Sequence, residues 1–163
     1  MQTTTIFNFS KKTETTDWTI ANDVVMGGKS LAKIYVNLEG SGVFEGRISL
    51  ENNGGFSSVR YRSNSINTKS YSKIILKVKG DGKRYQFRIK DKISNGYSYV
   101  TYFNSSTDWQ TIEIPLSSMY PTFRGRKLNI GNYNSEHLEE IAFLIGNKKE
   151  ESFKLEIDTV VLQ

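Results

Sequence analysis

Apolar and polar residues alternate along most of the chain, and this period of two is typical of strands that bury one face. In residues 43–50, Phe44, Ile48 and Leu50 share one face, while Glu45 and Arg47 point to the other. Similar runs cover residues 56–62, 74–79, 84–90, 97–103, 110–114, 141–145 and 153–162. Only short pieces such as residues 135–140 have the pattern of a helical turn. Roughly nine or ten strands predict an all-β, two-sheet β-sandwich or jelly roll.

Two turn signals fall between neighbouring runs. Residues 51–55, ENNGG, predict a hairpin between the runs 43–50 and 56–62. Residues 80–83, GDGK, predict a second hairpin between the runs 74–79 and 84–90. In the last run Asp158 changes the phase of the alternation, which favours a β-bulge or a buried hydrogen-bonding role over a calcium ligand.

Composition limits the class of protein. A hydrophobic content of 37% with 12% aromatic residues is enough for one core, so residues 1–163 are predicted to form a single domain. The lack of Cys excludes disulfides and thiolate metal sites and fits a reducing compartment. The first residues do not have the pattern of a signal peptide, and no apolar run has the length of a membrane span. We therefore expect a cytoplasmic protein without membrane insertion.

The positive charge is concentrated in one segment. The net charge is +5, whereas residues 69–92 hold nine basic and two acidic residues, a net of +7. The predicted hairpin places its polar side chains on one face, and these are Lys77, Lys79, Arg84, Gln86, Arg88 and Lys90. If Arg60 and Arg62 share that side, the surface suits an acidic protein segment, an anionic sugar or a nucleic-acid backbone. Plain solubility of an exposed strand explains it equally well. Nucleic acid is the least favoured ligand, because the hairpin's aromatic residues fall on the apolar face.

Few residues suggest catalysis. His137, the single histidine, lies in the hydrophilic stretch SEHLEE, and no serine has a nucleophile-elbow sequence around it. The GDGK turn does not have the spacing of a phosphate-binding loop. Paired carboxylates for glycoside hydrolysis stay open for Asp23, Glu45, Glu51 and Asp108. The prediction is a non-enzymatic domain with no cofactor and no metal site.

Aromatic residues gather in residues 97–109. They suit a platform on which a sugar ring stacks, or simply the core. Strict alternation puts Tyr97, Tyr99 and Phe103 on one face, where they are expected to be mainly buried, and Tyr102 on the opposite face.

Two glycine-containing motifs are the strongest functional signals. They are NDVVMGGKS, residues 22–30, and LENNGGFSSVR, residues 50–60. Paired glycines allow positive φ and close approach of another backbone or a ligand. One interpretation is a polar recess at one rim of the sheets, lined by Asn22, Asp23, Asn52 and Asn53, and the alternative is ordinary turn chemistry. Downstream, a loop after Pro121 carries Arg124 and Arg126 and is placed to reach across the sandwich edge.

These motifs resemble those of the CIA30 family, named for complex I intermediate-associated protein 30. The first motif matches at Trp18, Asn22, Asp23, Val25, Met26, Gly27, Gly28 and Ser30, and the second runs from Phe44 to Arg60. Further similarity lies in residues 80–82, 109–116, 124–126 and 153–158, so that nearly the whole chain is covered. The resemblance implies a galactose-binding-like jelly roll, a fold shared with carbohydrate-binding modules. It also implies kinship with mitochondrial chaperone-like factors that assemble respiratory complex I, with this chain a bacterial single-domain member.

The sequence thus predicts a binding domain for a protein partner. Asp23, Asn52 and Asn53 are expected to fix the two loops, while Arg60 and the arginines of the RGR motif meet the partner. The alternatives are a carbohydrate-binding module, or an NAD(P)-linked or hydrolytic enzyme, which requires a deep pocket with convergent titratable groups. The candidate binding residues are Asn22, Asp23, Met26, Gly27, Gly28, Asn52, Asn53, Gly54, Gly55, Phe56, Ser58, Arg60, Arg124 and Arg126.

Overall fold

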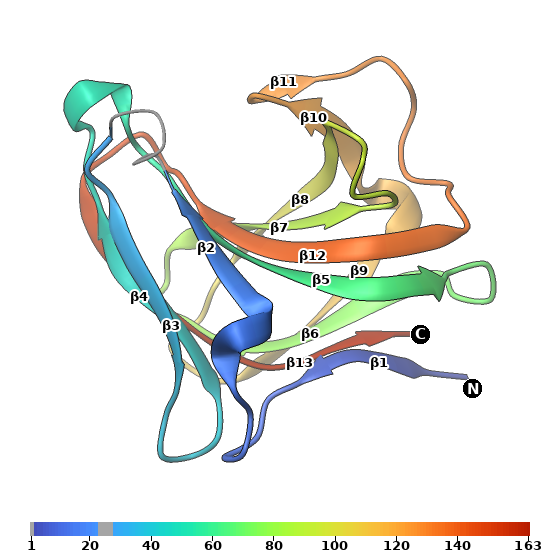
Figure 1. Cartoon of the computed structure of the whole chain (residues 1–163), viewed down its shortest axis with the longest axis horizontal. Helices are drawn as coiled ribbons and strands as arrows, with labels where there is room; N and C mark the ends of the chain where they lie inside the picture. Colours follow the sequence, from blue (N-terminus) through green and yellow to red (C-terminus); the bar gives the residue numbers. More distant parts are fainter. Residues whose placement is uncertain (1, 23–27) are drawn as a thin grey trace.

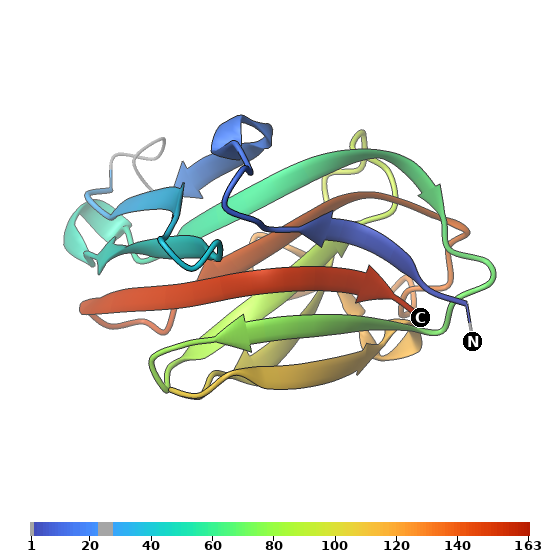
Figure 2. The same cartoon turned by 90° about the horizontal axis from the view of Figure 1, so that it is seen from below.

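The computed structural model describes residues 2–22 and 28–163 (Figure 1). Within these residues the regular structure is strand, apart from three short 3₁₀ turns: η1 (Thr15–Asp17), η3 (Glu51–Asn53) and η4 (Leu116–Ser118). The strands form two antiparallel sheets that pack face to face (Figure 2). No helix in the described part of the chain has the length and apolar character required to cross a membrane.

The first sheet, called sheet A, has six strands in the order β3-β4-β13-β6-β9, with β1 also paired to β13. The long strand β13 organises it, because residues 151–157 pair with β4 and residues 159–162 pair with β1. The strands are β1 (Thr4–Asn8), β3 (Leu31–Val36), β4 (Gly42–Ile48), β6 (Lys73–Lys79), β9 (Gln110–Pro115) and β13 (Glu151–Leu162).

The second sheet, called sheet B, has seven strands in the order β11-β10-β8-β7-β12-β5-β2. Within it, β12 pairs with β7 on one side and β5 on the other. The strands are β2 (Trp18–Asn22), β5 (Ser57–Asn67), β7 (Arg84–Lys90), β8 (Ser98–Asn104), β10 (Tyr120–Phe123), β11 (Arg126–Lys127) and β12 (His137–Ile145).

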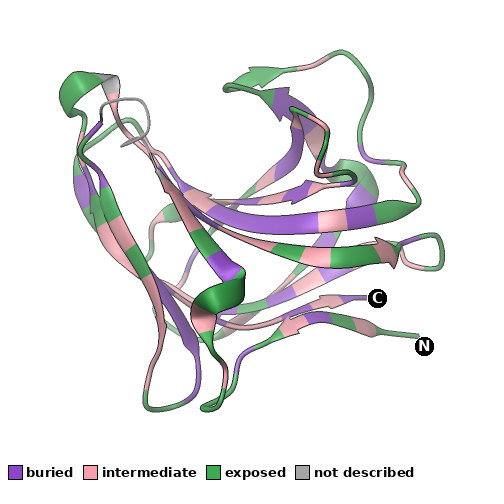
Figure 3. Cartoon of the chain, in the orientation of Figure 1, coloured by how far each residue is buried: buried purple, intermediate pink, exposed green. Residues whose placement is uncertain are grey.

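The core lies between the two sheets, as the alternation predicts. Phe87 and Phe143 of sheet B and Leu76 and Leu155 of sheet A are completely buried there, and a purple run marks much of β12 in Figure 3. In β8 the predicted phase is confirmed, because Tyr99 and Phe103 are buried and Tyr102 is exposed on the opposite face. The all-β, two-sheet prediction is therefore confirmed.

Both predicted hairpins are wrong. Strand β4 lies in sheet A and β5 in sheet B, and likewise β6 lies in sheet A and β7 in sheet B. Residues 49–56 and 80–83 are therefore connections that cross from one sheet to the other. A turn signal fixes the local backbone but does not determine the next strand's partner, which here is a strand far along the chain. As a consequence, Lys77 and Lys79 lie on sheet A, away from the basic residues of β7.

Two smaller expectations have opposite outcomes. The helical turn at residues 135–140 is wrong, since β12 begins at His137, an exposed residue. The bulge at Asp158 is confirmed, because the pairing of β13 with β6 skips from Ile157 to Thr159. Asp158 Oδ2 lies 3.5 Å from Lys77 Nζ, so its carboxylate faces an ammonium group.

Candidate functional site

The described flanks of the two glycine motifs meet at one end of the sandwich. The Ser30 hydroxyl accepts a hydrogen bond from Ser49 N at 3.0 Å and lies 3.3 Å from Ser49 O, to which it donates. Beside it, Lys29 Nζ lies 3.6 Å from Glu51 Oε2. We call residues 28–30 and 49–56 the glycine rim. Of the predicted site residues, Asp23, Met26 and Gly27 lie outside the described residues, as do the side chains of Asn22 and Asn53.

Backbone conformation accounts for part of the second motif. Asn52 has φ +55° and Gly55 has φ +142°, a value that L side chains rarely adopt. The next crossing connection packs closely here, because a Cβ at Gly146 would lie 3.3 Å from Gly55 O and from the Phe56 Cβ. These residues thus shape the crossing between the sheets, and their contact with a partner stays a prediction.

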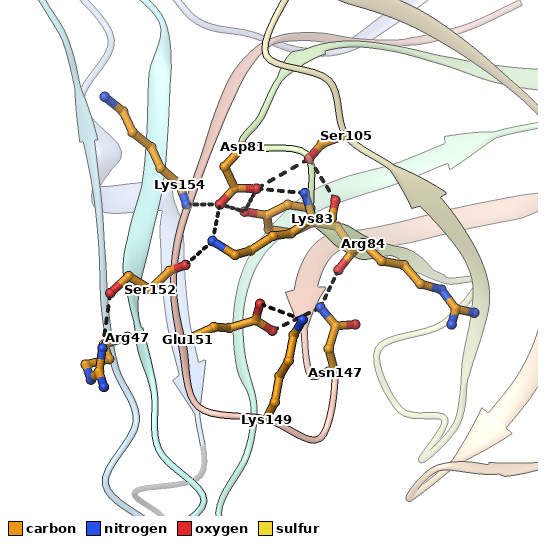
Figure 4. Close-up of polar contacts among 11 residues, drawn as sticks. Arg47, Asp81, Lys83, Arg84, Ser105, Asn147, Lys149, Glu151, Ser152 and Lys154 are labelled. Atoms are coloured by element: carbon orange, nitrogen blue, oxygen red, sulfur yellow. Dashed lines mark hydrogen bonds and ion pairs between the residues drawn. The ribbon is translucent and has the colours of Figure 1, made fainter.

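The GDG motif forms a polar clamp between the sheets (Figure 4). The Asp81 carboxylate accepts hydrogen bonds from Lys154 N at 2.8 Å, Lys83 N at 3.2 Å and the Tyr85 hydroxyl at 3.1 Å. Lys83 Nζ is 3.7 Å away. Burial, followed by the charge of Asp81, raises the pKa of Tyr85. Asp81 therefore ties β13 of sheet A to β7 of sheet B, a role that the turn signal did not reveal.

Close packing extends this clamp. A Cβ at Gly80 would lie 2.2 Å from the Ser105 Cβ, so only glycine fits without a shift. Nearby, Asn147 Nδ2 donates to Arg84 O at 3.0 Å and to Glu151 Oε2 at 3.1 Å (Figure 4). The end of the sandwich that carries the sheet crossings is thus held by polar contacts as well as by the core.

The outer face of sheet B carries arginines at its centre. Ala142 of β12 lies directly opposite Arg60 of β5 on one side and Arg88 of β7 on the other. Across the sheet this row continues to Thr19 of β2 beyond Arg60 and to Val100 of β8 beyond Arg88. Two guanidinium groups therefore flank one small side chain. Among the described residues, neither Arg60 nor Arg88 forms an ion pair.

One carboxylate shares this face, in the neighbouring row. Glu140 lies opposite Arg62 of β5 and Lys90 of β7, and it is 4% exposed. Arg62 Nε donates to Glu140 Oε1 at 3.3 Å, while Lys90 Nζ donates to Asn95 O at 3.0 Å. The acid is thus engaged by a residue other than the two central arginines.

Two tyrosines lie on the same face beside the central arginines. The Arg84 guanidinium carbon is 3.7 Å from the centre of the Tyr102 ring, a cation–π contact. Gln86 Nε2 donates to the Tyr102 hydroxyl at 3.4 Å, and Gln86 Oε1 accepts from Arg88 Nη1 at 2.9 Å. Burial raises the pKa of Tyr120, and Tyr102 also raises it, whereas Arg84 and Arg88 oppose the rise. These contacts hold the side chains in one connected layer.

This face lies on the inside of a curve. In Figure 1 the strands β10 and β11 rise at one side of sheet B and η3 rises at the other. Although Val100 and Ala142 point away from the core, they are only 1% and 6% exposed, so longer neighbours cover them. Burial also lowers the pKa of Arg88, and the charge of Arg60 acts in the same direction, whereas Tyr102 and Glu140 oppose this shift. Arginine keeps its charge, so a partly desolvated cation results.

The RGR motif forms a tight turn at the far edge of sheet B. Phe123 of β10 pairs with Arg126 of β11, and the two residues between them, Arg124 and Gly125, have φ +50° and +79°. Positive φ at both central positions is the geometry of a two-residue hairpin loop. Three strands separate β10 from β5, which carries Arg60. The predicted surface therefore divides into the RGR turn at one edge and Arg60 with the glycine rim toward the other.

Ser58 joins the second of these groups. It lies on β5 between the glycine rim and Arg60, and its hydroxyl donates to Ala21 O at 2.8 Å.

Two of the carboxylates considered for hydrolysis, Glu45 and Glu51, have other partners. Glu45 accepts from the Tyr35 hydroxyl at 2.9 Å and faces Lys33, and Glu51 belongs to the glycine rim. Among the described residues there is no group of three or more His, Cys, Asp or Glu side chains arranged to hold a metal ion. These contacts provide no argument for a catalytic centre.

The family model of Complex I intermediate-associated protein 30 (CIA30) matches residues 7–157. The chain belongs to the CIA30 family. It is 26% identical to the mitochondrial complex I intermediate-associated protein 30 of Drosophila melanogaster, over 99% of this chain and 63% of that protein. The Mus musculus protein of the same name is 23% identical, over 98% of this chain and 56% of that protein. This CIA30 chain thus spans little more than half the length of these relatives.

Solved structures support the fold of this CIA30 domain. A family 11 carbohydrate-binding module from Clostridium thermocellum, in complex with a β-1,3-1,4-mixed-linked tetrasaccharide, superposes with a TM-score of 0.75 at 20% identity, covering 98% of this chain and 94% of that one. The same module family in the cellulase Lic26A-Cel5E gives a TM-score of 0.76 at 19% identity, covering 99% and 94%. The galactose-binding-like jelly roll is therefore confirmed, and the likeness reaches no further than the fold.

Proposed function

We propose that this CIA30 domain is a non-enzymatic binding module that recognises an acidic segment of a protein partner on the outer face of sheet B. The observation that carries the proposal is the pair Arg60 and Arg88, which flank Ala142 with no carboxylate in their row. Guanidinium groups bind carboxylates through paired, charge-assisted hydrogen bonds. We infer that both guanidinium groups reach one carboxylate above the small side chain of Ala142.

The surroundings favour a protein segment over a free ion. Partial burial strengthens the attraction between Arg88 and an incoming carboxylate, because the local dielectric is lower than in water. Tyr102 offers an exposed ring beside the arginines, and tyrosine with arginine is the composition of protein-binding hot spots. The family's relatives are named as complex I intermediate-associated proteins, which supports an assembly or chaperone-like role.

Other predicted residues enter the proposal at its margins. The glycine rim and the RGR turn lie toward opposite edges of this face, so we infer that they border the bound segment and contribute less than the central arginines. We also infer that residues 1–163 act as one domain, and the cytoplasmic location stays a prediction. The carbohydrate alternative rests on a different region, because the exposed Trp109 directly precedes β9 of sheet A.

A fluorescein-labelled hexaglutamate peptide tests the proposal by fluorescence anisotropy. The double variant Arg60→Ala/Arg88→Ala is expected to weaken binding on the order of tenfold or more, because two charge-assisted contacts are lost. Binding by the parent chain should also fall steeply as salt rises from about 0.05 to 0.5 M, since exposed charges are screened. Arg60→Lys/Arg88→Lys should be intermediate, since charge remains but paired hydrogen bonding does not.

The control is Arg47→Ala, which removes an exposed arginine from the outer face of sheet A. It should bind the peptide as the parent chain does. Equal weakening by Arg47→Ala and by the double variant would show that only net charge matters. Unchanged binding by a folded double variant would overturn the proposed site.

A further inference from the structure

A second surface, on the outer face of sheet A, carries an exposed tryptophan beside a pocket. Trp109 directly precedes β9 and is 41% exposed. The pocket has a volume of about 420 Å³, within the range of small-molecule sites. The turn of the β3–β4 hairpin also lines the pocket, and its Leu38 is 91% exposed. The pocket therefore has apolar groups at its mouth.

The floor of the pocket is polar and held in place. Asn37 Nδ2 donates to Glu156 Oε1 at 2.8 Å, and Asn37 Oδ1 accepts from Ser41 N at 2.9 Å, so the amide has a defined orientation. Lys79 Nζ lies 4.0 Å from Glu156 Oε2, and the Glu156 side chain is only 17% exposed. These groups stand on strands and a tight turn, which keeps them ordered before a ligand arrives.

The charges of the lining cancel. Lys79 and Lys154 contribute two positive charges, and Glu39 and Glu156 contribute two negative charges, so the net charge is zero. The two carboxylates repel an anionic ligand, and the two ammonium groups repel a cationic one. A neutral ligand that both donates and accepts hydrogen bonds satisfies all of them. The exposed indole adds a flat apolar surface to these polar groups.

We propose that this pocket binds a neutral pyranose unit of an oligosaccharide. The apolar C–H face of the ring stacks on Trp109, and ring hydroxyls donate to Glu156 and accept from Lys79 or Lys154. The site lies on the other sheet from Arg60 and Arg88, so it is independent of the proposed protein-binding face. The lining residues determine this ligand class, since the likeness to carbohydrate-binding modules establishes the fold alone.

Intrinsic fluorescence gives a direct test, because the chain has two tryptophans and Trp18 is only 5% exposed. The probes are four neutral tetrasaccharides: cellotetraose, xylotetraose, mannotetraose and the β-1,3-1,4-mixed-linked tetrasaccharide. At least one is expected to produce a saturable change in Trp109 emission and to protect it from acrylamide quenching, with a dissociation constant up to about 1 mM. Glu156→Gln keeps the reporter and should weaken binding at least several-fold.

Calorimetric titration covers the variant that removes the reporter. Trp109→Ala is expected to abolish the heat of binding. Two control variants should bind the saccharide as the parent chain does: Tyr102→Ala, which deletes an exposed ring on sheet B, and Arg60→Ala/Arg88→Ala. If no probe binds, or if Trp109→Ala retains binding, the pocket proposal is wrong. If Tyr102→Ala abolishes binding, the sugar lies on sheet B, which also overturns it. None of these outcomes bears on the hexaglutamate experiment.

Discussion

The outer faces of the two sheets differ in how their charged side chains are paired. On sheet A, Lys73 Nζ lies 2.6 Å from Glu113, Lys77 lies 3.5 Å from Asp158, and Lys79 lies 4.0 Å from Glu156. Each of these pairs joins neighbouring strands. On sheet B, the one cross-strand ion pair within the described residues is Arg62 with Glu140, while Arg60 and Arg88 stay unpaired at the centre.

The contrast separates structural charge from charge available to a partner. Exposed pairs of sheet A contribute little stability each, about 0–1 kcal/mol, but they match each of the lysines of β6 with a carboxylate, whereas Arg47 and Lys154 of the same sheet form no ion pair among the described residues. A guanidinium that is partly desolvated without a carboxylate lowers stability, because burial disfavours the charged form. Residues that break a local rule in this way are where function is expected. Sheet B therefore suits an acidic ligand, and the paired charges around Trp109 suit a neutral one.

The largest expected effect comes from Asp81→Asn, which acts on both faces at once. Replacing the carboxylate weakens its charge-assisted bonds to Lys154 N and the Tyr85 hydroxyl, which connect sheet A to sheet B. We expect the free energy of unfolding to fall by about 2–4 kcal/mol. Urea denaturation followed by circular dichroism measures this.

Asp108→Asn is the matched control, since Asp108 is exposed in a connection between sheets, and it should change stability by less than about 0.5 kcal/mol. In native conditions Asp81→Asn should impair hexaglutamate and saccharide binding together, unlike Arg88 or Trp109 variants. Loss of one binding activity alone would contradict the role of Asp81 as a clamp shared by the two sheets.

The next largest effect is a change in the free energy of unfolding that has opposite signs for substitutions on the two outer faces. Glu156→Gln should destabilise the fold by about 0.5–1.5 kcal/mol, because Lys79 loses its partner and the hydrogen bond from Asn37 loses its charged acceptor. Arg88→Met should be neutral or stabilising by up to about 1 kcal/mol, because a partly buried charge without an ion pair is replaced by an apolar chain. Thermal and urea unfolding of both variants give the comparison. Marked destabilisation by Arg88→Met would show that Arg88 is structural.

The sequence predicted which side chains point outward on these faces but not which strands lie next to one another. The alternation of β7 and β5 put Arg88 and Arg60 on outward positions, and the phase of β8 put Tyr102 outward as well. Side-chain direction depends only on neighbouring residues, so a period of two is enough to predict it. The sequence did not predict that β12 lies between β5 and β7 and brings Ala142 between the two arginines, because that pairing joins distant segments.

Long-range topology also explains the other differences. Treating GDGK as a hairpin turn placed Lys77 and Lys79 beside Arg84 and Arg88, whereas the chain crosses to the other sheet at Asp81. The aromatic residues from 97 to 109 were considered as one platform, yet Tyr102 lies on β8 of sheet B and Trp109 directly precedes β9 of sheet A. The pocket joins the turn at Asn37 to a strand end and to β13, a combination with no signature in any single segment.

The smallest expected effect is on the free energy of unfolding at alkaline pH. It distinguishes Tyr99, on the inner face of sheet B, from Tyr120, on the outer face. Burial, with Asp91 nearby, raises the pKa of Tyr99 to about 12. The pKa of a tyrosine in an unfolded chain is about 10. The contribution of Tyr99 to the free energy of unfolding is therefore fully present below about pH 10 and is lost as the pH rises toward about 12. Tyr99→Phe should therefore flatten the decline of stability over this range. The pKa of Tyr120 is raised by burial but opposed by Arg84 and Arg88, so Tyr120→Phe should flatten the decline less. Urea unfolding at several alkaline pH values measures how steeply the stability of each variant declines. A larger flattening by Tyr120→Phe than by Tyr99→Phe would mean that Arg84 and Arg88 do not create the positive potential that an acidic partner requires.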